Sequence, residues 1–111
     1  MAKPYTYDFK DCLVGDTIDA ISFKDIDVDG VDADLTGVAI RMQIKGSSGN
    51  IVKDLTVGNG LTLIGTDGVT INPFILNRKD TYKYDIQFTF AGGVVRTWFK
   101  GSIKVLDDVT E

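Results

Sequence analysis

Histidine is missing from this sequence of 111 residues. Cysteine, proline and glutamate are scarce: the only residues of these three types are Cys12, Pro4, Pro73 and Glu111. Without histidine the chain has no Ser-His-Asp or Cys-His nucleophile system and lacks the ligands of most zinc sites. A lone cysteine forms no disulfide within the chain, which argues against a small disulfide-stapled secreted scaffold. We interpret Cys12 as a small, buried or half-buried apolar side chain.

Long apolar runs and nucleotide-binding glycine motifs are also missing. No stretch approaches the roughly 20 apolar residues that span a bilayer, and the N-terminus has no apolar signal-peptide core. Neither Gly-x-x-x-x-Gly-Lys-Ser/Thr nor Gly-x-Gly-x-x-Gly occurs. Two aspartates acting as glycosidase acid and base need a deep cleft, for which a chain of this size offers little room. We therefore expect a soluble, non-enzymatic protein with no catalytic residue and no cofactor.

The charge balance is acidic, with a formal net charge of −4. Lysines and arginines are spread along the chain, and no basic patch is visible in the sequence. An acidic chain is repelled by phosphate backbones, so nucleic-acid binding is disfavoured. We expect neither nucleic-acid nor membrane partners.

Strand-forming residues and glycine dominate what is present. The apolar fraction is 43% and there are twelve glycines, which suits many short strands joined by tight turns. Residues 81–90 alternate apolar and polar side chains, Ala91-Gly92-Gly93 supplies a turn, and a second alternating strand runs to Val105. This period of two predicts one long β-hairpin whose apolar face must be covered.

Turn signals divide the rest of the chain into further short strands. We expect strands at residues 5–9, 17–23, 38–45, 51–57, 61–64 and 69–71, and one helix-like turn at 74–80. Residues 1–4 are expected to be a loose arm and 107–111 an exposed tail of one domain spanning 1–111. About seven to nine short strands predict an antiparallel β-sandwich, with a closed barrel as the alternative. Gly101, in mid-strand, marks a bulge, a close backbone approach or a bend between sheets.

The acidic segment 25–34 contains the sequence D-x-D-x-D-G, which opens an EF-hand-type calcium loop. The twelfth position is Thr36 rather than a bidentate glutamate, and the flanks are strand-like rather than helical. The alternative interpretation is a hairpin connection whose aspartates favour turns and solvation. We assign no metal ligand here and keep calcium as an open hypothesis.

Trp98 stands on the otherwise polar phase of the last strand, which it shares with Val94, Arg96 and Lys100. One interpretation is an anchor at a subunit interface, or a platform that stacks on a sugar. The other is packing against lysine and arginine stems on an open sheet face. We favour the interface, made by Trp98, Arg96, Val94 and Lys100, because Val94 adds apolar area to it.

Three segments together resemble a known family. They are residues 14–17 (VGDT), residues 34–44 (DLTGVAIRMQI), and a third with YKYDIQ at 82–87, GVVRT at 93–97, KGSIKV at 100–105 and DVT at 108–110. Over residues 13–110 this pattern is similar to the N-terminal immunoglobulin-like domain of the phage baseplate upper protein family and its small single-domain relatives. The chain ends at Glu111, whereas long family members continue into helical and docking regions. The resemblance carries over no catalytic or binding residue.

This resemblance implies an immunoglobulin-like sandwich in a bacteriophage or prophage virion, in the tail or baseplate. The expected partners are other virion subunits, with the chain as a symmetric homo-oligomer made in the host cytoplasm. The alternatives are a carbohydrate- or calcium-dependent binding module and a capsid decoration or head-fibre protein. A hydrolase is a more distant possibility.

Overall fold

The structure is a computed structural model that describes residues 5–24, 26–28, 31–32, 34–90 and 92–106, with only the backbone at 27–28 and 31–32. The described residues form strands and no helix, which confirms the all-β class. The main sheet has nine strands, eight of them in the order β1 (Tyr5–Thr6), β13 (Val95–Leu106), β12 (Asp80–Thr89), β7 (Ala39–Lys45), β8 (Ile51–Val57), β9 (Gly60–Ile64), β10 (Gly68–Ile71) and β4 (Ile21–Phe23).

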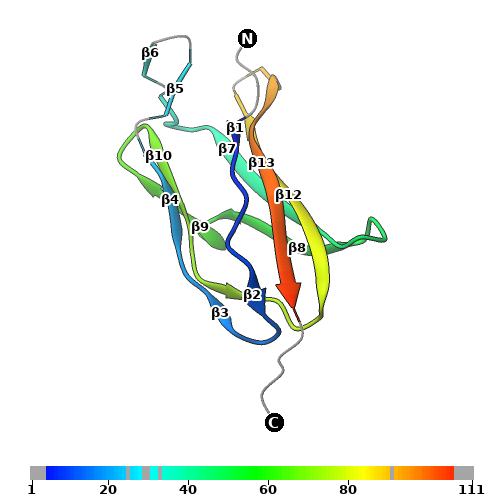
Figure 1. Cartoon of the computed structure of the whole chain (residues 1–111). Coiled ribbons are helices and arrows are strands. Elements are labelled where there is room, and N and C mark those ends of the chain that lie inside the picture. The colour runs from blue at the N-terminus through cyan, green and yellow to red at the C-terminus, as the bar shows by residue number, and fades with distance from the viewer. Residues whose placement is uncertain (1–4, 25, 29–30, 33, 91, 107–111) are drawn as a thin grey trace.

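The ninth strand of this sheet, β2 (Cys12–Leu13), also pairs with β13. Two small sheets stand apart from the main one: β3 (Thr17–Ile18) with β11 (Phe74–Ile75), and β5 (Asp27–Val28) with β6 (Val31–Asp32). Figure 1 shows β3 at the lower end of the molecule and the β5–β6 hairpin at its upper left.

The β12–β13 hairpin confirms the prediction made from residues 81–105. The two strands pair antiparallel from Asp80 opposite Val105 to Thr89 opposite Val95, and Gly92 and Gly93 both take positive φ in the turn. The apolar phase of β12 is buried, and so is that of β7, whose alternation was equally regular. Period-two patterning therefore placed the centre of the sheet correctly.

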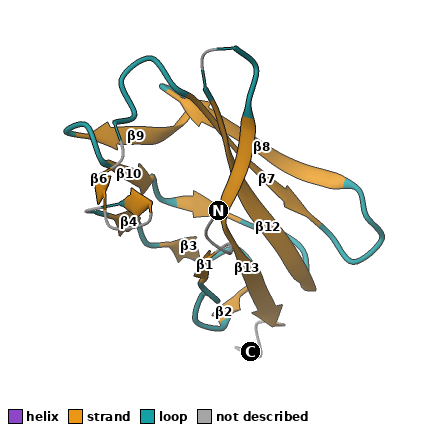
Figure 2. Ribbon diagram, turned by 90° about the horizontal axis from the view of Figure 1, so that it is seen from above, coloured by secondary structure: helices purple, strands orange, loops and turns teal. Residues whose placement is uncertain are grey.

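The main sheet curls until its two ends face each other. Phe23 of β4 stacks on Phe99 of β13 with ring centroids 4.3 Å apart, although these strands are the last and the second in the strand order. Tyr7, between β1 and β2, meets Phe23 edge-on at 5.9 Å. The buried apolar side chains form one cluster. Figure 2 shows the curl of the strands from above.

The sheet is mixed, which corrects the expected antiparallel arrangement. Both β1 and β2 run parallel to β13, and β8 meets β9 in a short parallel register. The structure is a strongly curled half-barrel, neither two clearly separate antiparallel sheets nor the closed barrel considered as the alternative. Two of the three parallel pairings come from the N-terminal segment, because it lies alongside β13 rather than forming a hairpin with its neighbour in sequence.

Two local predictions were wrong. Residues 17–23 form two strands in different sheets: β3 pairs with β11 in a small sheet, and β4, which follows Asp19 and Ala20, pairs with β10 in the main sheet. Residues 74–80 begin as β11 and have no helical turn. Phe74 and Leu76 are buried and Ile75 is exposed, so this short stretch follows the period of a strand.

Gly101 confirms the close approach that its position in mid-strand suggested. A Cβ at residue 101 would lie 2.7 Å from the carbonyl carbon of Tyr7 and 3.0 Å from Cε2 of Tyr84. Hydrogen bonds from Tyr7 N to Lys100 O and from Phe9 N to Ser102 O, both 2.9 Å, hold the N-terminal segment at this distance. Only glycine leaves room for that backbone.

Candidate interaction surfaces

Trp98 is the extra residue of a β-bulge. The β12–β13 register pairs Ile86 with Phe99 and Gln87 with Thr97, so Trp98 has no partner of its own. Because a bulge changes the alternation of the strand, Trp98 turns toward the core side. Its ring is half-buried, with centroids 4.7 Å from Phe88 and 5.4 Å from Phe90.

The same bulge separates the four residues predicted to form one interface. Arg96 lies opposite Phe88, on the core side of the sheet, whereas Lys100 lies opposite Asp85 on the outer side. Val94 precedes the strand, and its carbonyl accepts a hydrogen bond from Phe90 N across the turn. The prediction assumed unbroken alternation, and no residue in the sequence marks the bulge.

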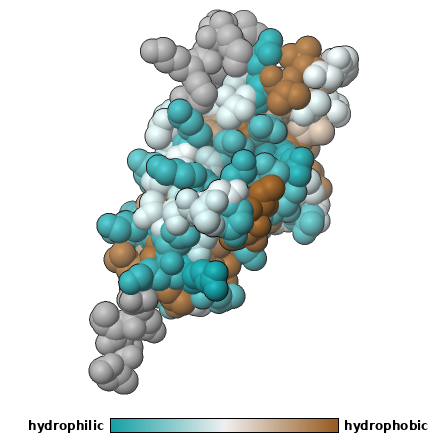
Figure 3. Space-filling view, turned by 90° about the vertical axis from the view of Figure 1, so that its right-hand side faces the viewer, coloured by the Kyte–Doolittle hydropathy of each residue, from teal (hydrophilic) through white to brown (hydrophobic). Residues whose placement is uncertain are grey.

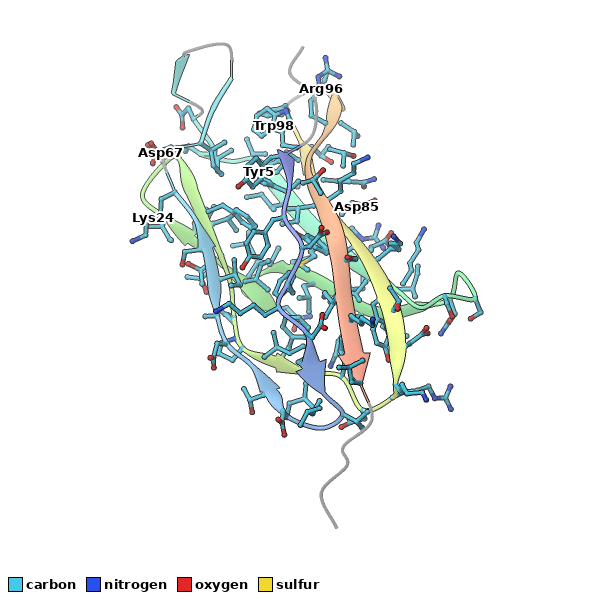
Figure 4. The ribbon with its side chains drawn as sticks, viewed as in Figure 1. Tyr5, Lys24, Asp67, Asp85, Arg96 and Trp98 are labelled. Atoms are coloured by element: carbon cyan, nitrogen blue, oxygen red, sulfur yellow. The ribbon has the colours of Figure 1, made fainter. Side chains whose placement is uncertain are left out.

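Exposed apolar side chains gather at the hairpin end of the molecule. Tyr5, Val94 and Val95 are 59%, 43% and 48% exposed, and the half-buried Trp98 is also at this end. We call these four residues the hairpin-end patch. Figure 4 shows Tyr5 and Trp98 at the upper end of the molecule, and Figure 3 shows apolar side chains at that end above a mostly hydrophilic face.

The outer side of β7, β12 and β13 is a basic face that sequence inspection missed. It carries Lys45, Lys83, Lys100 and Lys104, all of them exposed. The register sets Lys83 directly opposite Lys45, and Lys100 opposite Asp85. These lysines are far apart in sequence, but each lies at an outward-facing position of its strand. The expectation that no basic patch exists was therefore wrong.

A shallow hollow lies on this basic face beside β1. Thr6, Asp8, Lys83, Asp85 and Lys100 contribute to its lining. Asp8 Oδ1 accepts hydrogen bonds from the backbone N–H and the hydroxyl of Ser102 at 3.0 and 3.2 Å. Oδ1 of Asp85 is buried and has no hydrogen-bond partner among the described residues.

The acidic segment 25–34 forms a small hairpin where its backbone is described. β5 and β6 pair antiparallel with Asp27 opposite Asp32, which agrees with the hairpin interpretation of this segment. Most of its carboxylates lie outside the described residues, so the calcium hypothesis is untested there. Within the described part, no three His, Cys, Asp or Glu side chains are placed to hold a metal ion. Hydrogen bonds from the Thr36 hydroxyl and N–H lower the pKa of Asp34.

Cys12 has the environment of a structural thiol. It is half-buried, and its Sγ lies 3.7 Å from the carbonyl oxygen of Lys104 as a weak donor. Burial, and then the charges of Asp11 and Asp16, raise the pKa of the thiol. A raised pKa lowers the fraction of thiolate and with it the reactivity of the side chain.

No helix in the described part of the chain is long and apolar enough to cross a membrane. Comparison with known proteins finds no matching family model, curated protein or solved structure.

Proposed function

We propose that this chain is a non-enzymatic structural protein of a bacteriophage or prophage virion, in the tail or baseplate, acting through contacts with other subunits. The observation that carries the proposal is the hairpin-end patch. Tyr5, Val94 and Val95 are three of the eight large apolar side chains that the described part of the chain exposes, and they lie at one end of the domain. Grouped exposed apolar side chains are typical of protein–protein contact sites.

The segments that resemble the baseplate upper protein family support the same proposal. Residues 34–44 include β7 except for Lys45, and residues 82–105 contain most of β12 and β13, so the resemblance lies on the central strands of the sheet. The finer proposal is an immunoglobulin-like sandwich in which the two halves are joined through β8 and β9. The stacking of Phe23 on Phe99 supports it, because it is a contact between facing halves.

The packing of Trp98 favours assembly over carbohydrate binding. A sugar-binding tryptophan offers a free ring face, whereas this ring packs on Phe88 and Phe90 and is half-buried. Trp98 is therefore a packing residue beside the core rather than an open stacking platform. A capsid decoration or head-fibre protein would use the same surface at another place in the particle.

Peptide mass spectrometry on purified phage particles from the source organism tests this proposal. We expect the chain at a fixed copy number relative to the major tail protein, and that number identifies tail, baseplate or head. Absence from intact particles would overturn the proposal and favour a binding module.

A pair of matched variants tests the role of the patch. Val95→Asp places a charge in the hairpin-end patch, and Val57→Asp places one on β8, where Val57 is 41% exposed. We expect the Val95→Asp chain to be absent from assembled particles and the Val57→Asp chain to be incorporated at the wild-type copy number. Equal incorporation of both would show that the patch does not make the contact.

A further inference from the structure

The first part of β8 is an open strand edge. Residues 51–55 pair with β7 on one side, whereas on the other side β9 reaches only Thr56 and Val57. Thr56 N donates a hydrogen bond to Asn59 O on the β9 side. Because the backbone groups of a strand alternate between its two edges, Asp54 directs its N–H and C=O to the same side. No strand of the described chain lies beside them there.

Strand β11 has an open edge as well. It pairs with β3 through Phe74 and Ile75, and no described strand lies on its other side. In the strand order β9 separates β8 from β10, and it begins at Gly60, whose carbonyl accepts a hydrogen bond from Asn72 N at 2.9 Å. β11 follows just after Asn72 along the chain. The space between β8 and β11 therefore continues that of β9 but holds no described strand.

A hollow of about 490 Å³ lies in this space. Val52 and Lys53 of β8 and Ile75 of β11 contribute to its lining, so both open edges border it. Leu76 and Tyr82 of the lining are buried, whereas Val52 and Ile75 are 39% and 40% exposed. Figure 2 shows the β7–β8 hairpin extending to the right, away from β9. We call this hollow and its two edges the β8–β11 groove.

The charge of the β8–β11 groove is positive. Its charged lining residues are Lys53, Arg78 and Asp80, which sum to +1. The carboxylate of Asp80 already accepts hydrogen bonds from two backbone N–H groups, at 3.0 and 2.8 Å. Lys53 lies opposite Ile44, whose side chain is fully buried, so this lysine stands on the core side of the sheet. A ligand with carboxylates complements such a groove.

Two features of this edge oppose pairing with a second copy of itself. Val52 is an extra residue of β8 without a partner on β7, which marks a bulge. Lys53 is a charge that points inward from an edge strand. Bulges and inward charges are devices that keep exposed edges from pairing with one another. A second β8 would add another Lys53 to the groove, whereas an acidic segment would neutralise the one present.

We propose that the β8–β11 groove binds an extended acidic segment of another protein, which adds a strand beside β8. Main-chain hydrogen bonds to the open edge supply affinity, as in other cases of strand addition. Apolar side chains of the segment cover Leu76 and Tyr82, and its carboxylates pair with Lys53 and Arg78. The partner is thus recognised by an extended backbone that carries both apolar and acidic side chains.

This inference adds a second contact site to the proposed assembly role and rests on that role for its biological setting. Its tests use the purified chain and synthetic peptides, whereas the proposed function is tested on particles, so the two can fail separately. Val57, the control position for the hairpin-end patch, is outside the groove, because β9 already pairs with that end of β8.

Titration of the isotope-labelled full chain with a synthetic peptide is the first test. The peptide alternates valine and glutamate over seven residues, the length of β8. We expect binding with a dissociation constant below about 1 mM. The Asp54 amide should gain protection from hydrogen exchange, because the added strand accepts its N–H. The Gly49 amide is the reference, since it already bonds to Gly46 O.

Two further peptides of the same length separate backbone pairing from charge. Proline in place of valine keeps the carboxylates but prevents a strand ladder, so the Asp54 amide should stay unprotected. Lysine in place of glutamate keeps the backbone but reverses the charge, and should bind at least about tenfold more weakly. Both comparisons use the wild-type chain, so neither depends on the folding of a variant.

A charge-reversed variant tests the role of Lys53. Lys53→Glu should weaken binding of the glutamate peptide by at least about tenfold and strengthen binding of the lysine peptide. Lys24→Glu is the matched control, since it makes the same charge change at an exposed position outside the groove. Circular dichroism verifies folding, and Lys53→Gln should give a smaller loss if the reversed variant does not fold.

Four results would overturn the proposal. The first is no binding of the glutamate peptide up to about 1 mM, and the second is equal binding of the proline peptide. The third is an Asp54 amide that is protected in the monomer before any peptide is added, which would mean that this chain covers its own edge. The fourth is a wild-type dimer with that amide protected, which would make a second copy the occupant.

Discussion

Gly101 lies directly beneath the backbone carbonyl of Tyr7, whose carbon is 2.7 Å from the place that a Cβ on residue 101 would take. The hydroxyl of Tyr84 donates a hydrogen bond to that same carbonyl at 2.6 Å. At this point the N-terminal segment packs closely on β13, where Gly101 has no side chain, and is hydrogen-bonded to β12 through the Tyr84 hydroxyl. This contact closes the side of the core where Phe9 is buried.

Gly101→Ala should destabilise the fold by about 3 kcal/mol, because the new methyl group collides with backbone that cannot rotate away. Urea denaturation measures the loss. Gly92→Ala is the control: its φ is +88° but a Cβ there meets nothing within 4 Å, so its cost is about 1 kcal/mol. Equal costs for the two variants would mean that the N-terminal segment is not held against Gly101.

Tyr84→Phe removes the hydrogen bond to Tyr7 and should lower the free energy of unfolding by about 1 to 2 kcal/mol at neutral pH. Burial, followed by the charge of Asp8, raises the pKa of Tyr84 above its usual value near 10. Above pH 10 the unfolded chain therefore loses this proton while the folded chain keeps it, and stability falls as the pH rises. The fall should reach up to about 1.4 kcal/mol per pH unit.

Denaturation curves of the wild type and the Tyr84→Phe variant between pH 8 and about pH 12 measure this dependence. The stability of the variant should depend less on alkaline pH, because the titrating hydroxyl is gone. Parallel curves would show that Tyr84 does not titrate differently in the two states.

Trp98→Ala should lower stability by about 2 kcal/mol, since the half-buried ring loses its contacts with Phe88 and Phe90. Trp98→Phe should change it by less than about 1 kcal/mol, because an aromatic ring remains and the indole N–H has no partner in the described part of the chain. Thermal unfolding compares the two variants. A larger effect for Trp98→Phe than for Trp98→Ala would contradict this packing.

Asp80 anchors the loop between β7 and β8. Its carboxylate accepts hydrogen bonds from Ser47 N at 3.0 Å and Thr81 N at 2.8 Å, and the bond from Ser47 is the main reason that the pKa of Asp80 is lowered. A lowered pKa means that this stabilisation is present above the unfolded value near 3.9 and disappears as the pH falls through the folded value.

Hydrogen exchange at the Ser47 amide measures this anchor. The protection of the Ser47 amide, relative to its intrinsic exchange rate at the same pH, should fall at pH values below the folded pKa of Asp80, and at neutral pH in an Asp80→Ala variant. The Gly49 amide serves as the reference, because it bonds to the carbonyl of Gly46 instead. Loss of protection at both amides would indicate general opening rather than loss of this carboxylate.

The sequence by itself determined the all-β class, the β12–β13 hairpin and the buried phase of β7. Where one face of a strand must be buried, alternation with a period of two decides which side chains face the core, whichever strand lies beside it. It also marked Gly101 as a bulge, a close backbone approach or a bend between sheets, and the structure shows the close approach.

Tertiary structure alone decided which strands meet and which side chains share a face. The parallel pairing of β1 and β2 with β13 joins segments about ninety positions apart, and no local pattern encodes such a register. The bulge at Trp98 separates Arg96 from Lys100, because one unpaired residue reverses the alternation on one side of it. The basic face exists because pairing brings Lys45, Lys83 and Lys100 together from three strands, and a linear sequence shows only that each points outward.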